Sequence, residues 1–170
     1  MNSSEKYSLS RAGSNGWLVW LMLLFLIFAI IQSLLMQKND TIRKLITEYL
    51  RANGFTDEMI PIIVSQFAHE TNNFRSKSFV EGYNPSGMKL PVKRLTTATG
   101  VLYGHAKYDD LEAGVKDFRL YYTNLGYPEY YNAPLQVEQY VDTLKAKGYF
   151  EDSYDNYLRG VKHWYSVYYG

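Results

Sequence analysis

The feature that most constrains this chain is an uncharged apolar run near its start. Residues 16–36, GWLVWLMLLFLIFAIIQSLLM, form 21 consecutive positions without a charged side chain. At 1.5 Å rise per residue, a helix of this length spans roughly 30 Å, the thickness of a bilayer core. Trp17 and Trp20 lie at one end, where interfacial indoles are expected. The run predicts a transmembrane anchor over residues 16–36, and residues 1–15 before it predict a disordered tail.

A cleaved signal peptide is the competing interpretation of this run. The apolar region of a signal peptide is about 7–15 residues long and ends at a small-residue cleavage site. The present run is longer, and the sequence QSLLMQKN at its end offers no such site. Flanking charge leaves the orientation open, because basic residues stand on both sides of the run: Lys6 and Arg11 before it, and Lys38, Arg43, Lys44 and Arg51 after it.

The rest of the chain is electrically neutral, with sixteen basic and sixteen acidic residues from residue 37 onward. It has no basic stripe of the kind that a nucleic-acid groove needs, so we expect no nucleic-acid partner. The absence of cysteine excludes disulfides and thiolate metal sites. The three histidines are far apart in the sequence, so we expect no metal site and no cofactor.

Tyrosine is unusually frequent, with 17 residues in the chain. Each tyrosine has a flat apolar face and a hydroxyl, which suits a wet cleft that holds a polar ligand. Ordinary packing in the core is the competing explanation for each of them.

Residues 40–170 predict one α+β domain. Apolar periodicity and capping signals predict helices over residues 39–54 (with Asp40 or Thr41 as N-cap), 56–73, 108–126, 133–148 and 151–169. Residues 89–108 are rich in Val, Leu, Thr and Tyr and predict two or three short antiparallel strands with a turn at Thr99–Gly100. We therefore expect a mainly helical body with a small β-hairpin lobe inserted after the second helix of the domain.

Glu70 is the main candidate for chemistry. It follows Ile63 by seven residues and Phe67 by three, so its carboxylate shares the apolar face of the predicted helix. Burial and the negative end of the helix dipole both disfavour the charged form and would raise the pKa of Glu70. A general acid that works near neutral pH needs such a shift. The alternative is an exposed helix-end glutamate that pairs with Arg75 or Lys77.

Several segments between residues 41 and 165 carry a more specific pattern. SQFAHETNNF is followed by NPSGMK, and further on come AKYDDLEAGVKDF, YPEYYNA and LKAKGYFEDSYDNYL. In order and spacing these segments resemble the bacterial and phage glucosaminidase domain of the lysozyme-like superfamily. YPEYYNA resembles that family's Asn-Pro-Arg-Tyr segment, and NPSGMK resembles its Gly-hydrophobic-Lys loop. The resemblance covers nearly the whole of the chain after the apolar run.

The resemblance implies a lysozyme-like fold and hydrolysis of β-1,4 bonds in peptidoglycan after N-acetylglucosamine. Glu70 matches the catalytic acid of the family. Tyr130 matches the tyrosine of the Asn-Pro-Arg-Tyr segment, with the adjacent Tyr131 as a rival. We expect Glu70 and Tyr130 to be catalytic, and we expect the substrate-binding residues to be Tyr131, Asn84, Tyr103 and Thr97.

Gly87 and Lys89 match the family's Gly-x-Lys loop, and we interpret both as structural. The expected partners are peptidoglycan glycan strands and, through residues 16–36, the membrane. Together these features predict a single-pass membrane protein whose C-terminal domain faces the cell wall or periplasm, at a bacterial envelope and of host or phage origin.

The chain departs from the family in one respect. The family often carries a second acid on a Thr-rich strand, but RLTTATG over residues 94–100 has none, and no acid stands between Glu81 and Asp109. We interpret Asp109 and Asp110 as helix caps and place Glu81 in a loop. A two-carboxylate mechanism needs a second group about 5–9.5 Å from the acid, unless the 2-acetamido group of the sugar replaces it. A lytic transglycosylase or muramidase with one catalytic Glu, or a non-catalytic glycan-binding module, therefore remains an alternative.

Overall fold

The structure is a computed structural model that describes residues 16–124 and 136–170. The chain divides into two compact units, residues 1–38 and 39–170. The tail expected over residues 1–15 lies outside the described residues.

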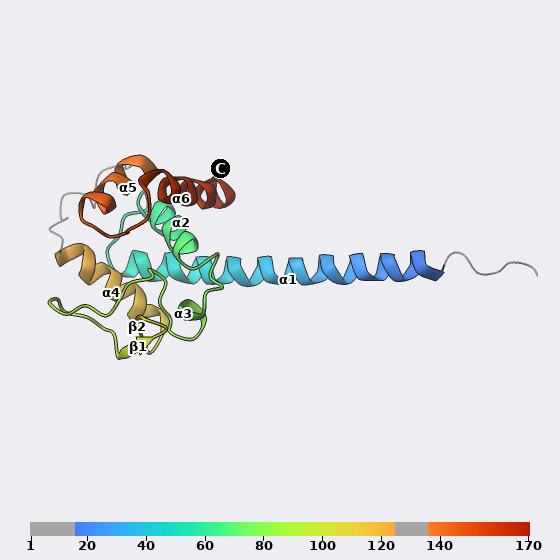
Figure 1. Cartoon of the computed structure of the whole chain (residues 1–170), viewed down its shortest axis with the longest axis horizontal. Coiled ribbons are helices and arrows are strands. Elements are labelled where there is room, and N and C mark those ends of the chain that lie inside the picture. The colour runs from blue at the N-terminus through green and yellow to red at the C-terminus, as the bar shows by residue number, and fades with distance from the viewer. Residues whose placement is uncertain (1–15, 125–135) are drawn as a thin grey trace, which may run out of the picture. The chain divides into compact units, whose positions relative to one another are not determined.

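Helix α1 extends from Gly16 to Ala52 (Figure 1). It contains the apolar run, whose side chains are largely exposed, and it is long and apolar enough to cross a membrane. The prediction of a separate helix that begins at Asp40 or Thr41 was wrong. Asp40 does not cap a helix start, because its carboxylate accepts a hydrogen bond from the Arg43 guanidinium at 3.0 Å on the surface of the continuing helix.

Helices α2 (Ile60–Glu70) and α6 (Tyr154–Tyr169) pack against each other in the second unit, and α5 (Val137–Ala146) packs on α6 (Figure 1). Helix α4 (Leu111–Asn124) adds a further apolar face. Burying one large apolar side chain contributes about 1.5–3 kcal/mol. The core that orders these helices includes Ile46, Leu50, Phe55, Ile63, Phe67, Val115, Phe118, Tyr122, Tyr140, Leu144 and Val161.

The ends of α2 set the position of its last residue, Glu70. Pro61 occupies the first turn, where the missing amide proton costs no helical hydrogen bond. After Glu70 the chain turns sharply, because Asn72, Asn73 and Phe74 all have positive φ, at 49°, 58° and 61°. The Thr71 hydroxyl stabilises this turn by accepting a hydrogen bond from the Phe74 amide at 2.9 Å. The helix predicted over residues 56–73 therefore exists in its central part and stops at the candidate acid.

The β lobe consists, within the described residues, of strands β1 (Gly100–Leu102) and β2 (His105–Lys107), which pair antiparallel with Val101 opposite Ala106. The predicted turn at Thr99–Gly100 was wrong, because Gly100 is the first residue of β1. The turn lies instead at Tyr103–Gly104, whose φ angles of 52° and 78° suit a tight hairpin. A short helix that was not predicted, α3 (Lys77–Val80), precedes the lobe and is capped by Ser76. The unit is thus mainly helical with a small antiparallel sheet, as the sequence predicted.

A buried carboxylate on α4 anchors the loop that enters the β lobe. Asp117 is fully buried and accepts hydrogen bonds from both terminal nitrogens of Arg94, at 3.0 and 2.7 Å. It also accepts from the Thr96 hydroxyl, the Thr97 amide and the Tyr108 hydroxyl. Burial by itself would raise the pKa of Asp117, but the hydrogen bonds from Arg94, Thr96 and Tyr108 outweigh it and hold that pKa below its usual value. Residues 94–97 are therefore fixed against the helical body.

Candidate active site

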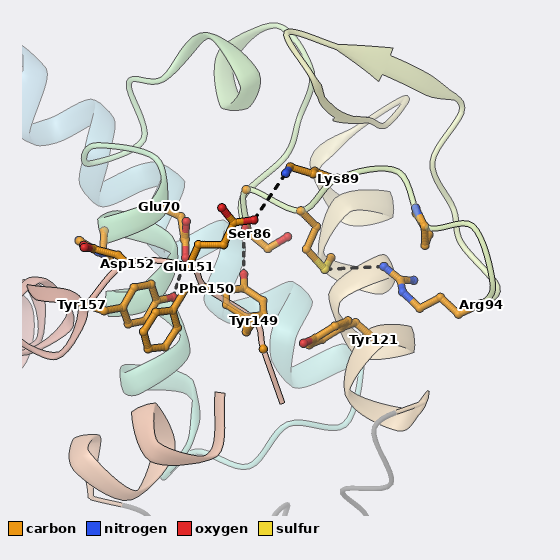
Figure 2. A pocket seen from close by; sticks show the side chains of 15 residues that line it. Glu70, Ser86, Lys89, Arg94, Tyr121, Tyr149, Phe150, Glu151, Asp152 and Tyr157 are labelled. Atoms are coloured by element: carbon orange, nitrogen blue, oxygen red, sulfur yellow. Dashed lines mark hydrogen bonds and ion pairs between the residues drawn. The ribbon is translucent and has the colours of Figure 1, made fainter. Parts of the chain in front are cut away.

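The second unit has a cleft of about 540 Å³ between the end of α2, the loop before the β lobe and the start of α6 (Figure 2). Its volume falls in the range of typical small-molecule sites. Tyrosine rings and charged side chains both contribute to its walls. The lining residues are His69, Glu70, Ser86, Gly87, Met88, Lys89, Pro91, Arg94, Tyr121, Gly148, Tyr149, Phe150, Glu151, Asp152 and Tyr157.

Glu70 lies at this cleft because the periodicity of α2 turns it inward. Ile63 and Phe67, on the same face, are fully buried in the core. Glu70 continues that face by one more turn and is itself only partly exposed. The carboxyl group therefore sits where the apolar core ends and the cleft begins.

A single tyrosine holds one oxygen of this carboxyl group. The Tyr157 hydroxyl donates a hydrogen bond to Glu70 Oε1 at 2.6 Å (Figure 2). The Tyr157 ring is itself fixed, because it stacks on Phe150 with a centroid distance of 3.7 Å and meets the His69 ring edge-on at 4.9 Å. The position of Oε1 is thus set by the aromatic rings that pack around Tyr157 of α6.

The other oxygen of Glu70 faces a glycine. Gly87 has φ +66°, and a Cβ atom added there would lie 3.0 Å from Glu70 Oε2. Two hydrogen bonds hold this loop in place. His105 Nδ1 and the Gly87 carbonyl oxygen are 2.8 Å apart, and the Tyr149 hydroxyl donates to the Ser86 carbonyl oxygen. Glycine therefore lets the loop pass close to Oε2 without covering it.

The environment of Glu70 favours its protonated form. Burial is the main cause and raises the pKa of Glu70 from 4.5 to about 7, while the hydrogen bond from Tyr157 acts in the opposite direction. A carboxyl group with such a pKa keeps a large share of its proton at neutral pH. It can therefore donate that proton to a leaving group in the cleft.

The neighbouring His69 is held by close packing. A Cβ atom at position 160 would lie 2.3 Å from the His69 ring, so only glycine leaves room for the imidazole. Burial lowers the pKa of His69, and the nearby charge of Asp152 partly offsets this effect. His69 is therefore predominantly neutral near pH 7, and its ring packs edge-on against Tyr157.

Two acids in the cleft were missed by the sequence reasoning. Glu151 and Asp152 lie in the loop between α5 and α6 and line the cleft together with Glu70. The resemblance places a second acid in the Thr-rich segment of the β lobe, where the sequence has none. The sequence signal for them is GYFED over residues 148–152, which begins at the helix stop Gly148. It lies within LKAKGYFEDSYDNYL, one of the segments that carry the family resemblance.

Three predicted substrate-binding residues do not line the cleft. Asn84 is fully buried, and its amide nitrogen donates to the carbonyl oxygens of Met88 and Ala106 at 2.9 and 2.8 Å. The Thr97 hydroxyl donates to the carbonyl oxygen of Ala113 at 2.6 Å. The Asn84 amide and the Thr97 hydroxyl therefore stabilise the fold by bonding backbone carbonyl oxygens. The prediction that these two residues bind substrate is replaced by a structural role.

Tyr103 lies at the tip of the β hairpin, where its hydroxyl donates to the exposed Glu81 at 2.6 Å. It too is absent from the cleft lining, and the turn that carries it lies four positions further along the chain than predicted. Tyr130 and Tyr131 lie outside the described residues, so their predicted roles stay predictions. The tyrosines that the structure places at the cleft are Tyr121, Tyr149 and Tyr157.

The Gly-x-Lys loop divides into two roles. Gly87 is structural, as expected, since it allows the close approach to Glu70. Lys89 is not, because its side chain is 79% exposed at the rim of the cleft and forms an ion pair with Glu151 at 4.0 Å (Figure 2). Across residues 16–124 and 136–170, no group of three or more His, Asp or Glu side chains could hold a metal ion.

Comparison of the chain with protein-family models, with curated proteins and with solved structures gives no match. The function of this chain is therefore inferred from the cleft itself.

Proposed function

We propose that residues 39–170 form a lysozyme-like peptidoglycan hydrolase that cleaves β-1,4 bonds after N-acetylglucosamine. The observation that carries the proposal is Glu70, a partly buried carboxyl group with a pKa of about 7 that opens on a cleft of about 540 Å³. A raised carboxyl pKa in an apolar setting is the property that a glycosidase acid requires. The mainly helical body with a small β lobe is compatible with a lysozyme-like fold.

The proposed reaction begins with proton donation from Glu70 to the glycosidic oxygen. Tyr157 fixes Oε1, so the proton is delivered from Oε2, the oxygen beside Gly87. As the bond breaks, Glu70 becomes a carboxylate, and the hydrogen bond from Tyr157 stabilises the charge that develops on it. Tyr121 and Tyr149 line the cleft and present aromatic rings to the sugars of the glycan.

The apolar helix α1 supports a membrane-anchored location for this activity. A hydrolase tethered by a membrane-spanning segment acts on wall polymer near the membrane surface. We propose that α1 crosses the membrane through residues 16–36 and that the C-terminal unit faces the cell wall or periplasm.

The test is product analysis after digestion of purified peptidoglycan by the full chain in detergent. Mass spectrometry should detect fragments that end in a reducing N-acetylglucosamine, and Glu70→Gln should reduce their release by roughly 1,000-fold. Glu81→Gln is the matched control, since Glu81 is exposed and lies outside the cleft lining, and it should leave the rate unchanged.

Anhydro-muramic ends instead of reducing ends would contradict hydrolysis and indicate a lytic transglycosylase. A wild-type chain that binds glycan strands without releasing fragments would overturn the enzymatic proposal in favour of a binding module.

A further inference from the structure

We infer that Glu151 is the second carboxylate of the cleft and acts as the general base that activates the attacking water. This inference rests on the proposed glycosidase activity. Glu151, in the loop between α5 and α6, takes the place of the strand acid that the sequence lacks.

The three acids near the β lobe each accept a hydrogen bond outside the cleft. Glu81 accepts a hydrogen bond from Tyr103, and Asp109 accepts one from Thr99 at 3.0 Å. Asp110 caps α4 by accepting from the Ala113 amide at 2.8 Å.

None of these three carboxylates lines the cleft. Within the described part of the chain, the acids that line the cleft together with Glu70 are Glu151 and Asp152.

Asp152 is held by the start of α6. Its Oδ1 accepts from the Ser153 amide at 2.6 Å and from the Asn156 side chain at 3.5 Å. Its charge also acts on His69, which packs against Gly160. A carboxylate that orders a helix start in this way is poorly placed to turn toward a sugar.

The Glu151 side chain is exposed and can reorient toward a water molecule in the cleft. Its side chain is 98% exposed and forms an ion pair with Lys89 at 4.0 Å. Lys89 comes from the loop before the β lobe and Glu151 from the loop before α6, so the pair joins two walls of the cleft (Figure 2). Ion pairs between exposed side chains are weak, so an entering glycan can separate this one. The carboxylate is then left beside the substrate with water around it.

The step balances as a single displacement. The oxygen of a water molecule attacks the anomeric carbon while Glu151 takes one proton from that water. Glu70 gives its proton to the glycosidic oxygen, and the carbon–oxygen bond to the leaving sugar breaks. The new bond forms on the face opposite the leaving group, so a β-linked substrate yields an α-anomeric product. Participation of the 2-acetamido group would instead retain the β configuration.

The experiment uses the full chain in detergent and soluble glycan fragments. Proton NMR of the first product should show the α anomer. Glu151→Ala should lower turnover roughly 100-fold or more, the loss expected for a general base. Azide should restore turnover of this variant with formation of an α-glycosyl azide, because the small anion needs no base. Glu81→Ala, at another exposed glutamate outside the cleft, serves as the control and should retain full turnover with no effect of azide.

A β-anomeric product, or a Glu151→Ala variant within threefold of wild type, would overturn the assignment of Glu151. Both results leave the glycosidase proposal intact as long as Glu70→Gln is inactive. Failure of the wild-type chain to release any reducing ends would instead remove the proposed function on which this inference rests.

Discussion

Tyr157 and Glu70 lie 87 positions apart in the chain, and the Tyr157 hydroxyl donates to Glu70 Oε1 at 2.6 Å. This hydrogen bond joins α6 to the last residue of α2 and leaves Oε2 as the oxygen that faces Gly87. It also opposes the effect of burial on the pKa of Glu70. The properties of the candidate acid are therefore set by tertiary packing as much as by its own helix.

Tyr157→Phe should move the alkaline limb of the pH–rate profile upward. Without the hydroxyl, burial acts unopposed, so the pKa of Glu70 rises and the acid stays protonated to higher pH. We expect a displacement of about one to two pH units in kcat/KM, because a hydrogen bond to a charged group contributes about 1.5–3 kcal/mol. Tyr103→Phe removes a Tyr–Glu hydrogen bond of the same 2.6 Å length outside the cleft, so its profile should match wild type. A profile for Tyr157→Phe that does not move would show that the bond has no effect on the acid.

Glu70 should make the stability of the chain depend on pH in the opposite sense from an ordinary salt-bridged acid. Its folded pKa of about 7 exceeds the ordinary glutamate pKa of 4.5, so the native state holds the proton more tightly than the unfolded state. The protonated Glu70 therefore contributes to the free energy of unfolding fully below about pH 4.5, and this contribution is lost as pH rises through 7. Its upper limit is about 3 kcal/mol. Thermal unfolding of wild type and Glu70→Gln, compared between pH 4.5 and 7.5, measures this loss. Equal pH dependence of the two proteins would contradict the raised pKa.

Gly87→Ala should reduce activity more than stability. The positive φ of 66° costs an alanine about 1–2 kcal/mol, and its Cβ would also lie 3.0 Å from Glu70 Oε2. We expect at least a tenfold loss of turnover from the displaced carboxyl group. Gly104→Ala has the same kind of backbone strain, at φ +78°, but its Cβ meets nothing within 4 Å. Equal turnover in the two variants, each measured on folded protein, would show that the contact with Glu70 is unimportant.

The helix stops and the inward direction of Glu70 could be predicted from the sequence, because both depend on local chemistry. Gly54 and Gly148 adopt positive φ, at 82° and 68°, where the predicted helices end. Spacing from Ile63 and Phe67 was enough to place Glu70 at the edge of the core. These features need only helical periodicity and the conformational freedom of glycine.

The partners of Glu70 could not be predicted in the same way. Tyr157 reaches it only because α6 packs on α2, and Glu151 joins the cleft only because of how the loop before α6 folds back. The polar groups of Asn84 and Thr97 looked available for substrate in the sequence, but each is satisfied by backbone atoms. No local pattern distinguishes such a structural hydrogen bond from a binding role.

Asp117→Asn should destabilise the second unit strongly. It removes the charge that pairs with Arg94 and leaves a guanidinium that is 8% exposed without a carboxylate. Breaking a buried pair from one side costs about 3–5 kcal/mol. Asp109→Asn, at an exposed carboxylate that accepts from Thr99, should cost less than about 1 kcal/mol. Chemical unfolding of both variants at pH 7 checks the difference, and similar losses would contradict an anchoring role for Asp117.

The proposed mechanism depends most on the proton that Glu70 holds near neutral pH. The direct measurement is a ¹³C NMR titration of the glutamate side-chain carboxyls in the full chain in detergent, with the Glu70 signal identified by its absence in Glu70→Gln. A general acid at this position should titrate with a midpoint at about pH 7. A midpoint near 4.5, the ordinary value for a glutamate, would contradict the role of Glu70 as a general acid.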